Sequence, residues 1–171
     1  EILVDKFNPH IGKTIKEIAA ENDIKYNPRS KSFVPSIVSS FLGIKGTRLK
    51  DIEEFAKADI EFKTVRLEPN GKPKESMSFE TIDFHQWMEE TWEDSHIRQR
   101  FLKTKFLFVV FEYKESAREN PDRELYFKGI KLWNMPYQTI ETKIKELWEE
   151  VRFKVQNGLD IQYKKRGNKL V

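Results

Sequence analysis

The sequence predicts an α/β fold in which helices flank a mixed sheet with a buried central strand. Residues 106–111 form an unbroken apolar run rich in aromatic and β-branched side chains, which is typical of a strand covered on both faces. Residues 137–156 carry apolar side chains at helical spacing and precede Asn157 and Gly158, a helix stop. Near the N-terminus, Thr14 and Glu17 have the spacing of a capping box, which begins a helix.

Composition limits the class of protein. A chain of 171 residues, 38% hydrophobic and 13% aromatic, predicts one folded domain over residues 1–171. No apolar run approaches the roughly 18 residues of a membrane span, and the absence of cysteine excludes disulfides and fits the reducing cytoplasm, where we expect the protein. The net charge of +3 permits a polyanionic partner without requiring one. Because the chain begins at Glu1 rather than Met, we expect a fragment of a longer polypeptide.

The elements follow from periodicity and from turn residues. Pro69, Asn70 and Gly71 form a turn signal between two strand-like stretches, so a hairpin is expected there. In chain order the sequence predicts helices at residues 14–22 and 35–42, strands at 59–67, 78–84, 105–113 and 125–133, a long helix at 137–156, and a short strand from residue 161.

The strand at residues 59–67 carries the candidate chemistry. Alternate side chains of a strand share a face, so Asp59, Glu61 and Lys63 are expected together, while Ile60 and Phe62 anchor the other face in a core. Two carboxylates beside an amine suit metal-assisted cleavage of phosphodiesters. A solvated strand face with a lateral salt bridge is the alternative, and on spacing alone it is the one we favour.

Three blocks of the chain resemble the MutH family, which joins a mismatch-repair nicking endonuclease to GATC-cutting type II restriction enzymes. Residues 91–98 are similar to its T-W-E-T-S-H-V-R segment, and residues 12–19 are similar to its first capped helix. The third block resembles its catalytic hairpin and consists of residues 55–64 with Leu67, Gly71, Pro73, Glu75 and Phe79. The resemblance implies a restriction-endonuclease-like fold. Within the family the chain looks most like the C-terminal, MutH-like part of a GATC-specific type II restriction endonuclease.

The resemblance also implies a reaction centre. Glu61 matches the family's metal-binding glutamate and Lys63 its catalytic lysine, and Mg²⁺ is the family's cofactor. Glu54 occupies the position of the metal-binding aspartate, seven residues before Glu61, and Ser39 occupies the position of a glutamate on the second helix. Since Mg²⁺ needs well-placed carboxylates, these two replacements predict a metal site at Glu54 and Glu61 that is degraded.

In this family, basic side chains line a DNA cleft. The matching side chains here are Arg98, Arg100, Lys103 and Lys105 on one wall and Arg29 and Lys31 on the other, where they would neutralise phosphates. We therefore expect an effector domain that binds duplex DNA containing GATC, beside a catalytic domain of the same polypeptide, with the base-reading loop beyond Val171. The alternatives are an active Mg²⁺-dependent endonuclease that uses Glu54, Glu61 and Lys63, and a protein-interaction domain without DNA binding.

Overall fold

The computed structural model describes residues 2–28, 30, 32–43, 59–158, 165–166 and 169–170. The chain divides into two compact units, of which the first comprises Glu1–Phe79 and Lys103–Asn134 and the second Glu80–Leu102 and Met135–Val171. A single domain over residues 1–171 stays a prediction. No helix in the described part is long and apolar enough to cross a membrane.

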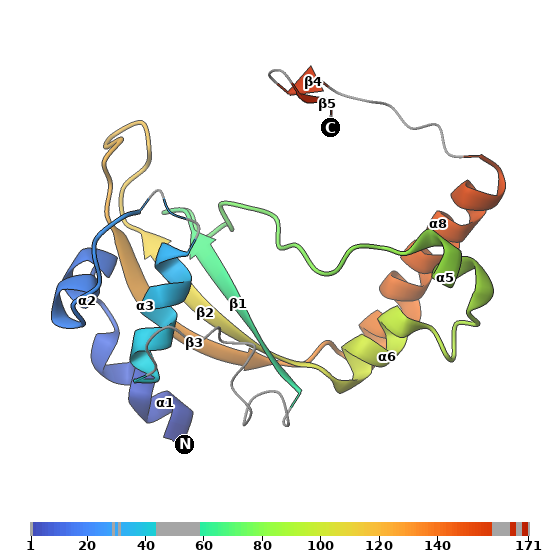
Figure 1. Cartoon of the computed structure of the whole chain (residues 1–171), viewed down its shortest axis with the longest axis horizontal. Helices are drawn as coiled ribbons and strands as arrows, with labels where there is room; N and C mark the ends of the chain where they lie inside the picture. Colours follow the sequence, from blue (N-terminus) through green and yellow to red (C-terminus); the bar gives the residue numbers. More distant parts are fainter. Residues whose placement is uncertain are drawn as a thin grey trace. The chain divides into compact units, whose positions relative to one another are not determined.

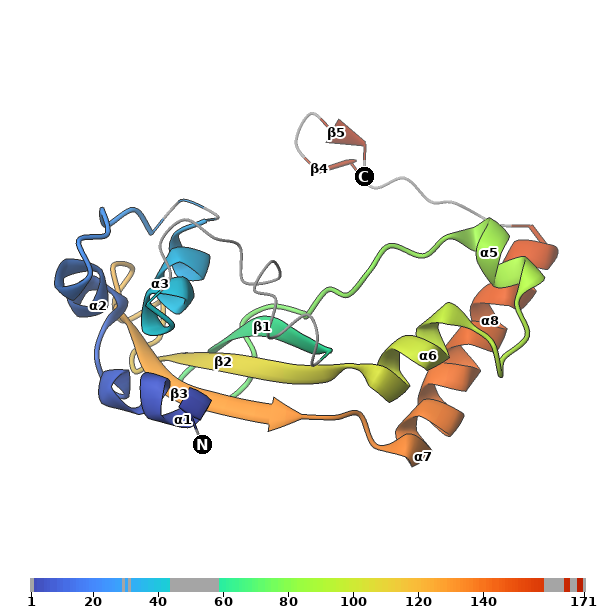
Figure 2. The same ribbon diagram turned by 60° about the horizontal axis from the view of Figure 1, so that its bottom comes forward.

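The first unit is built on a mixed sheet. Strands β1 (Ile60–Leu67) and β2 (Lys105–Tyr113) run parallel, and β2 pairs with the antiparallel strand β3 (Leu125–Trp133). The order β1-β2-β3 places β2 in the centre, between its two neighbours (Figure 2). These pairings confirm the expected mixed sheet. The buried strand expected at residues 106–111 is also confirmed, because Phe106, Val109 and Phe111 are at most 1% exposed.

Helices cover one face of this sheet. They are α1 (Ile2–Phe7), α2 (Ile15–Glu21) and α3 (Phe33–Phe41), which lie together beside the sheet (Figure 1). The 3₁₀ turn η1 (Asn8–His10) follows α1. The core on this face joins Phe7 of α1, Ile18 of α2 and Phe41 of α3 to Phe111 and Phe127 of the sheet. The aromatic rings of Phe7 and Phe41 meet edge to face with 5.2 Å between their centroids, a favourable geometry that adds to the burial.

Local sequence signals account for several of these elements. The Thr14 hydroxyl accepts a hydrogen bond from the Glu17 N–H, and the Glu17 carboxylate accepts one from the Thr14 N–H, so the expected capping box begins α2. The helix expected at residues 35–42 is confirmed as α3, which begins two residues earlier. In β3, Gly129 has φ of +138° beside a bulge opposite Val110 and Phe111, a backbone conformation that favours glycine.

The described part of the second unit up to residue 156 is mainly helical. It contains α5 (Phe84–Glu89), α6 (His96–Lys103) except for its last residue, α7 (Tyr137–Thr139), the π-helical segment η3 (Ile140–Ile144) and α8 (Lys145–Gln156). The helix expected at residues 137–156 is confirmed, with a π-helical turn inside it. Both views show α5 and α6 beside α8 (Figures 1 and 2). Trp92 and Trp148 are each 5% exposed and their rings lie 5.6 Å apart, so aromatic packing holds this unit together.

Three expectations require correction or lie outside the description. The strand expected at residues 78–84 is wrong: residues 78–83 are irregular, and α5 begins at Phe84 because the Asp83 carboxylate caps it by accepting hydrogen bonds from the N–H groups of His85 and Gln86. Asp59 precedes β1 in a turn with φ of +51° instead of extending the strand. The strand expected from residue 161 lies outside the residues that the structure describes. Further along the chain, β4 (Lys165–Arg166) and β5 (Lys169–Leu170) form a short antiparallel pair.

Candidate functional site

Glu61 and Lys63 lie on the face of β1 that is turned away from the helices. Their registered neighbours on β2 are Phe106 and Phe108, whereas Ile60 on the alternate face packs against the helical core. The Lys63 ammonium is 2.8 Å from the Glu61 carboxylate, and the two side chains are 17% and 30% exposed. The expected alternation is therefore confirmed for this pair, and the two groups neutralise each other directly.

Lys63 has two further contacts, both with the segment that follows the β1 turn. Its ammonium donates a hydrogen bond of 2.9 Å to the main-chain carbonyl of Ser78. It also lies 4.9 Å from the ring centroid of Phe79, close enough for a cation–π interaction. The Phe79 ring in turn meets the buried Phe106 edge to face at 5.7 Å. Residues 78 and 79 thus hold the lysine against the sheet.

A groove of about 780 Å³ runs beside β1 within the first unit. Its lining is mixed: Phe62, Met77 and Pro35 are apolar, whereas Lys63 and Arg66 bring positive charge. Arg66 is paired with the Glu75 carboxylate. Residues 28, 30, 34 and 35 form one side of the groove, residues 62–66 the strand side, and residues 73–78 the remaining side. Lys63 is therefore one of the charged side chains that line a concave surface.

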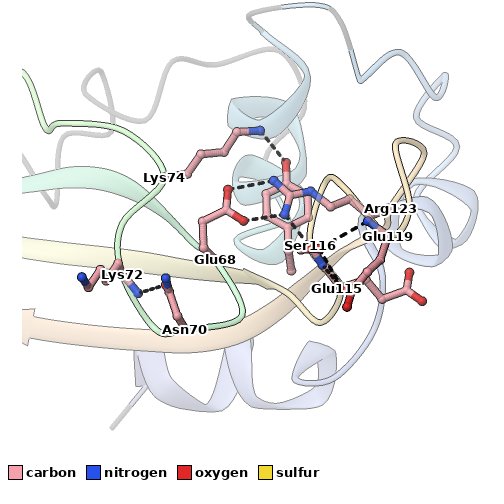
Figure 3. Close-up of polar contacts among 9 residues, drawn as sticks. Glu68, Asn70, Lys72, Lys74, Glu115, Ser116, Glu119 and Arg123 are labelled. Atoms are coloured by element: carbon pink, nitrogen blue, oxygen red, sulfur yellow. Dashed lines mark hydrogen bonds and ion pairs between the residues drawn. The ribbon is translucent and has the colours of Figure 1, made fainter.

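At the far end of β1 a buried arginine joins the β1 turn to the rest of the sheet. The Arg123 guanidinium binds both oxygens of the Glu68 carboxylate, with 2.8 Å between Nη2 and Oε1, and its side chain is only 6% exposed. Figure 3 shows the Glu68 carboxylate directed toward Arg123. This bond holds the pKa of Glu68 below its ordinary value and raises that of Arg123, because each charge favours the charged form of the other.

The basic side chains proposed to contact DNA differ in their surroundings. In the second unit, Arg98 Nε lies 2.7 Å from the Glu141 carboxylate and Nη1 donates to the Glu93 carbonyl, while Arg100 binds Glu80. Glu141 also accepts a 2.8 Å hydrogen bond from the Trp92 indole. The hydrogen bond from Trp92, and then that from Arg98, hold the pKa of Glu141 below its ordinary value. Both arginines therefore have intramolecular carboxylate partners.

Lys103 and Lys105 are exposed and belong to the first unit. The remaining candidates, Arg29 and Lys31, lie outside the described residues, as does Glu54. Of the expected reaction centre, the structure thus brings Glu61 and Lys63 together and does not describe the position of Glu54. The roles assigned to all of these residues stay predictions.

The described donors do not assemble a site for Mg²⁺. Within the described ranges, no group of three or more His, Asp or Glu side chains is arranged to hold a metal ion. Ser39 is buried in α3, and its hydroxyl donates to the Pro35 carbonyl at 3.0 Å. Asp59 lies in the turn before β1, where its main-chain carbonyl accepts a hydrogen bond from Lys105. Mg²⁺ takes near-octahedral oxygen ligation, usually with one or two carboxylates, and of the two carboxylates expected to hold it only Glu61 is among the described residues.

Sequence reasoning missed Ser78 and Arg123 as parts of the site, and it named Phe79 only within the block that resembles the family's catalytic hairpin. Ser78 acts through its main-chain carbonyl, which no side-chain pattern reveals. Arg123 and Glu68 are 55 positions apart in the sequence, and one basic residue in a polar loop carries no periodic signal. The expected hairpin at Pro69–Gly71 was the nearest available sign, because a turn there brings the following segment back beside β1.

The mixed sheet, the helices on one of its faces and a glutamate–lysine pair on an edge strand define a nuclease-like α/β domain of the restriction-endonuclease type. The family model for the DNA mismatch repair enzyme MutH matches residues 47–146, more than half of the chain. The chain belongs to the MutH family.

Two kinds of relative are similar to this chain. The type II restriction enzyme Sau3AI of Staphylococcus aureus is 32% identical over 173 residues, which cover 95% of this chain and 34% of that enzyme. The DNA mismatch repair protein MutH of Actinobacillus pleuropneumoniae is 29% identical over 154 residues, covering 88% of this chain and 65% of the relative. The MutH of Haemophilus influenzae is 28% identical over 154 residues. The chain thus spans about a third of the restriction enzyme and just under two thirds of these MutH proteins.

Proposed function

We propose that this chain is a duplex DNA-binding effector domain of a type II restriction endonuclease that recognises GATC, and that its own metal site is degraded. The observation that carries the proposal is the state of Lys63, whose ammonium is held by the Glu61 carboxylate and the Ser78 carbonyl. In a metal-assisted nuclease these two side chains would face the ion and the phosphate instead. Here each is the other's partner.

The replacements at two acidic positions support the same conclusion. A buried serine hydroxyl that donates to a helix carbonyl, as Ser39 does, cannot neutralise a divalent cation at neutral pH. Glu54 stands where the family has an aspartate, and its longer side chain would place a ligand oxygen differently. The similarity to part of a type II restriction enzyme supports duplex DNA as the partner. We propose that a catalytic domain of the same polypeptide carries out the cleavage.

The alternative is an active Mg²⁺-dependent endonuclease acting at GATC. The observation that favours it is that Glu61 and Lys63 share one strand face beside a groove, as the chemistry requires. The protein-interaction domain without DNA binding has no comparable observation in its favour.

A combined binding and nicking assay on the full chain separates these functions. Short duplexes with GATC or a scrambled site are titrated with and without Mg²⁺, and supercoiled plasmid is incubated with the same sample. We expect salt-dependent binding of duplex DNA and no nicking. Nicking that needs Mg²⁺ and is lost in Lys63→Ala would overturn the proposal in favour of the endonuclease. No binding at low salt would leave only the protein-interaction domain.

A further inference from the structure

Four residues at one end of the sheet, Glu68, Lys74, Tyr113 and Arg123, form a clamp on the β1 turn. Glu68, directly after β1, is held by the Arg123 guanidinium. Lys74, on the returning arm of the turn, donates a 3.3 Å hydrogen bond to the Tyr113 hydroxyl. Tyr113 ends β2, and its ring lies 3.7 Å from the Arg123 guanidinium carbon. Both arms of the turn are therefore attached to the same end of β2 and β3 (Figure 3).

Further contacts fix the Arg123 guanidinium in the clamp. Its Nη1 also donates to the Glu115 carbonyl at 3.0 Å, in the connection between β2 and β3. Local hydrogen bonds stabilise that connection. The Glu119 carboxylate accepts hydrogen bonds from the N–H and the hydroxyl of Ser116, and the Ser116 hydroxyl accepts one from the Glu119 N–H. A bidentate, stacked and largely buried guanidinium is a rigid attachment that a lysine cannot reproduce.

The returning arm leads from the clamp to Lys63. The turn closes with hydrogen bonds of 2.8 Å from the Lys74 N–H to the Arg66 carbonyl and from the Glu68 N–H to the Lys72 carbonyl. Glu75 then pairs with Arg66. Four residues beyond Lys74, the Ser78 carbonyl accepts the hydrogen bond from Lys63 and Phe79 covers its ammonium. The path of residues 74–79 beside β1 therefore starts at the clamp and ends at the lysine.

We propose that Arg123 is a positioning residue for Lys63: by clamping the β1 turn, it sets the path of residues 74–79 and so keeps the Lys63 ammonium enclosed beside Glu61. The proposal rests on the proposed function only in treating Lys63 as part of the site. It deepens that function by naming the tertiary contact that holds the lysine in its inward, paired state. Release of the clamp would make more of the Lys63 ammonium available to an anionic ligand in the groove that this side chain already lines.

Chemical modification of Lys63 tests this without DNA. The full chain is treated with a lysine-acylating reagent under native conditions, and the modification rate of Lys63 is measured by mass spectrometry relative to that of Lys16, an exposed residue on α2. We expect several-fold faster modification of Lys63 in Arg123→Ala and in Glu68→Gln. In Arg123→Lys, Lys63 should be modified nearly as fast as in Arg123→Ala, because a lysine cannot form the bidentate bond with Glu68. Phe79→Ala is the positive control, since it uncovers the ammonium directly.

Two matched variants separate positioning from general stability. Glu112→Gln removes the ion pair with Lys128 between β2 and β3 without touching the clamp, and Ile18→Val weakens the same unit's core. Both should leave the Lys63 rate unchanged. If Arg123→Ala does not fold, Glu68→Gln and Tyr113→Phe, which removes only the hydroxyl that Lys74 contacts, carry the test. An unchanged Lys63 rate in folded clamp variants, or an equal increase in Ile18→Val, would overturn the proposal, whether or not the chain binds DNA.

Discussion

The Lys63 ammonium lies 2.8 Å from the Glu61 carboxylate, two residues earlier on the same strand face. Alternation along β1 brings the two side chains together, and the Ser78 carbonyl completes the enclosure of the amine. The pair as a whole carries no net charge, and of its two members Lys63 is the one that lines the groove. The behaviour of the pair toward a polyanion therefore depends on which member is removed.

Glu61→Ala is expected to leave duplex binding intact or to strengthen it. The substitution removes a negative charge beside the groove and leaves Lys63 with the Ser78 carbonyl as its polar partner. Fluorescence anisotropy with a labelled duplex, at several salt concentrations, measures the change. Lys63→Ala is the matched variant and should weaken binding. Weaker binding by Glu61→Ala than by the unaltered chain would show that the carboxylate is needed for DNA, as a bridging ion would require.

Lys103→Ala and Lys105→Ala should each weaken duplex binding and flatten its dependence on salt. Both side chains are exposed, and each phosphate contact contributes about one unit to the slope of log K against log salt concentration. Lys16→Ala on α2 serves as the control for a simple loss of positive charge. Slopes that match that of Lys16→Ala would place the DNA contact on another surface.

Arg98→Ala is expected to have a second effect that Lys103→Ala lacks. The Arg98 guanidinium binds Glu141, which also accepts a hydrogen bond from the Trp92 indole. Removing the guanidinium leaves the partly buried Glu141 carboxylate with one partner fewer. Three of the four tryptophans, Trp87, Trp92 and Trp148, lie in the second unit, so tryptophan fluorescence during thermal unfolding should report a lower transition midpoint. An unchanged midpoint in Arg98→Ala would mean that this ion pair adds nothing to stability and leaves Arg98 available to phosphate.

Acid should destabilise the fold through its paired carboxylates. The pKa values of Glu68 and Glu141 are lowered in the folded state, so their contribution is fully present above the ordinary glutamate pKa of about 4.3 and is lost as the pH falls through the lowered values. Burial lowers the pKa of His10. Its contribution to stability is therefore also lost in acid, as the pH falls below its ordinary pKa of about 6.5. Stability should therefore rise with pH across these ranges.

Circular dichroism melting at a series of pH values measures this dependence. Glu68→Gln should give a lower melting temperature at neutral pH and a shallower decline in acid, because the group that titrates has been removed. Glu146→Gln, which loses the exposed ion pair with Lys143, is a suitable control and should decline like the unaltered chain. A decline in Glu68→Gln as steep as in the control would show that this carboxylate is not responsible.

Much of the fold was predictable because its signals are local. The capping box at Thr14 and Glu17, the apolar stripe of the long helix and the continuous apolar run of β2 each depend on neighbours in sequence. The strand expected at residues 78–84 was wrong because the turn at Pro69–Gly71 suggested a returning strand, whereas the local cap at Asp83 begins α5 instead. Alternation along β1 correctly placed Glu61 and Lys63 on one face.

By itself, the sequence determined the class of fold, the family and the candidate pair on β1, since helix caps, strand alternation and motif spacing are written in consecutive residues. Only the tertiary structure decided what surrounds that pair. Ser78 and Phe79 reach Lys63 because a turn brings the chain back beside β1, and Arg123 reaches Glu68 across 55 positions because the carboxyl ends of two parallel strands meet at one end of the sheet. Contacts between distant segments depend on how strands pair and how side chains fill the space between them, and no local pattern encodes either.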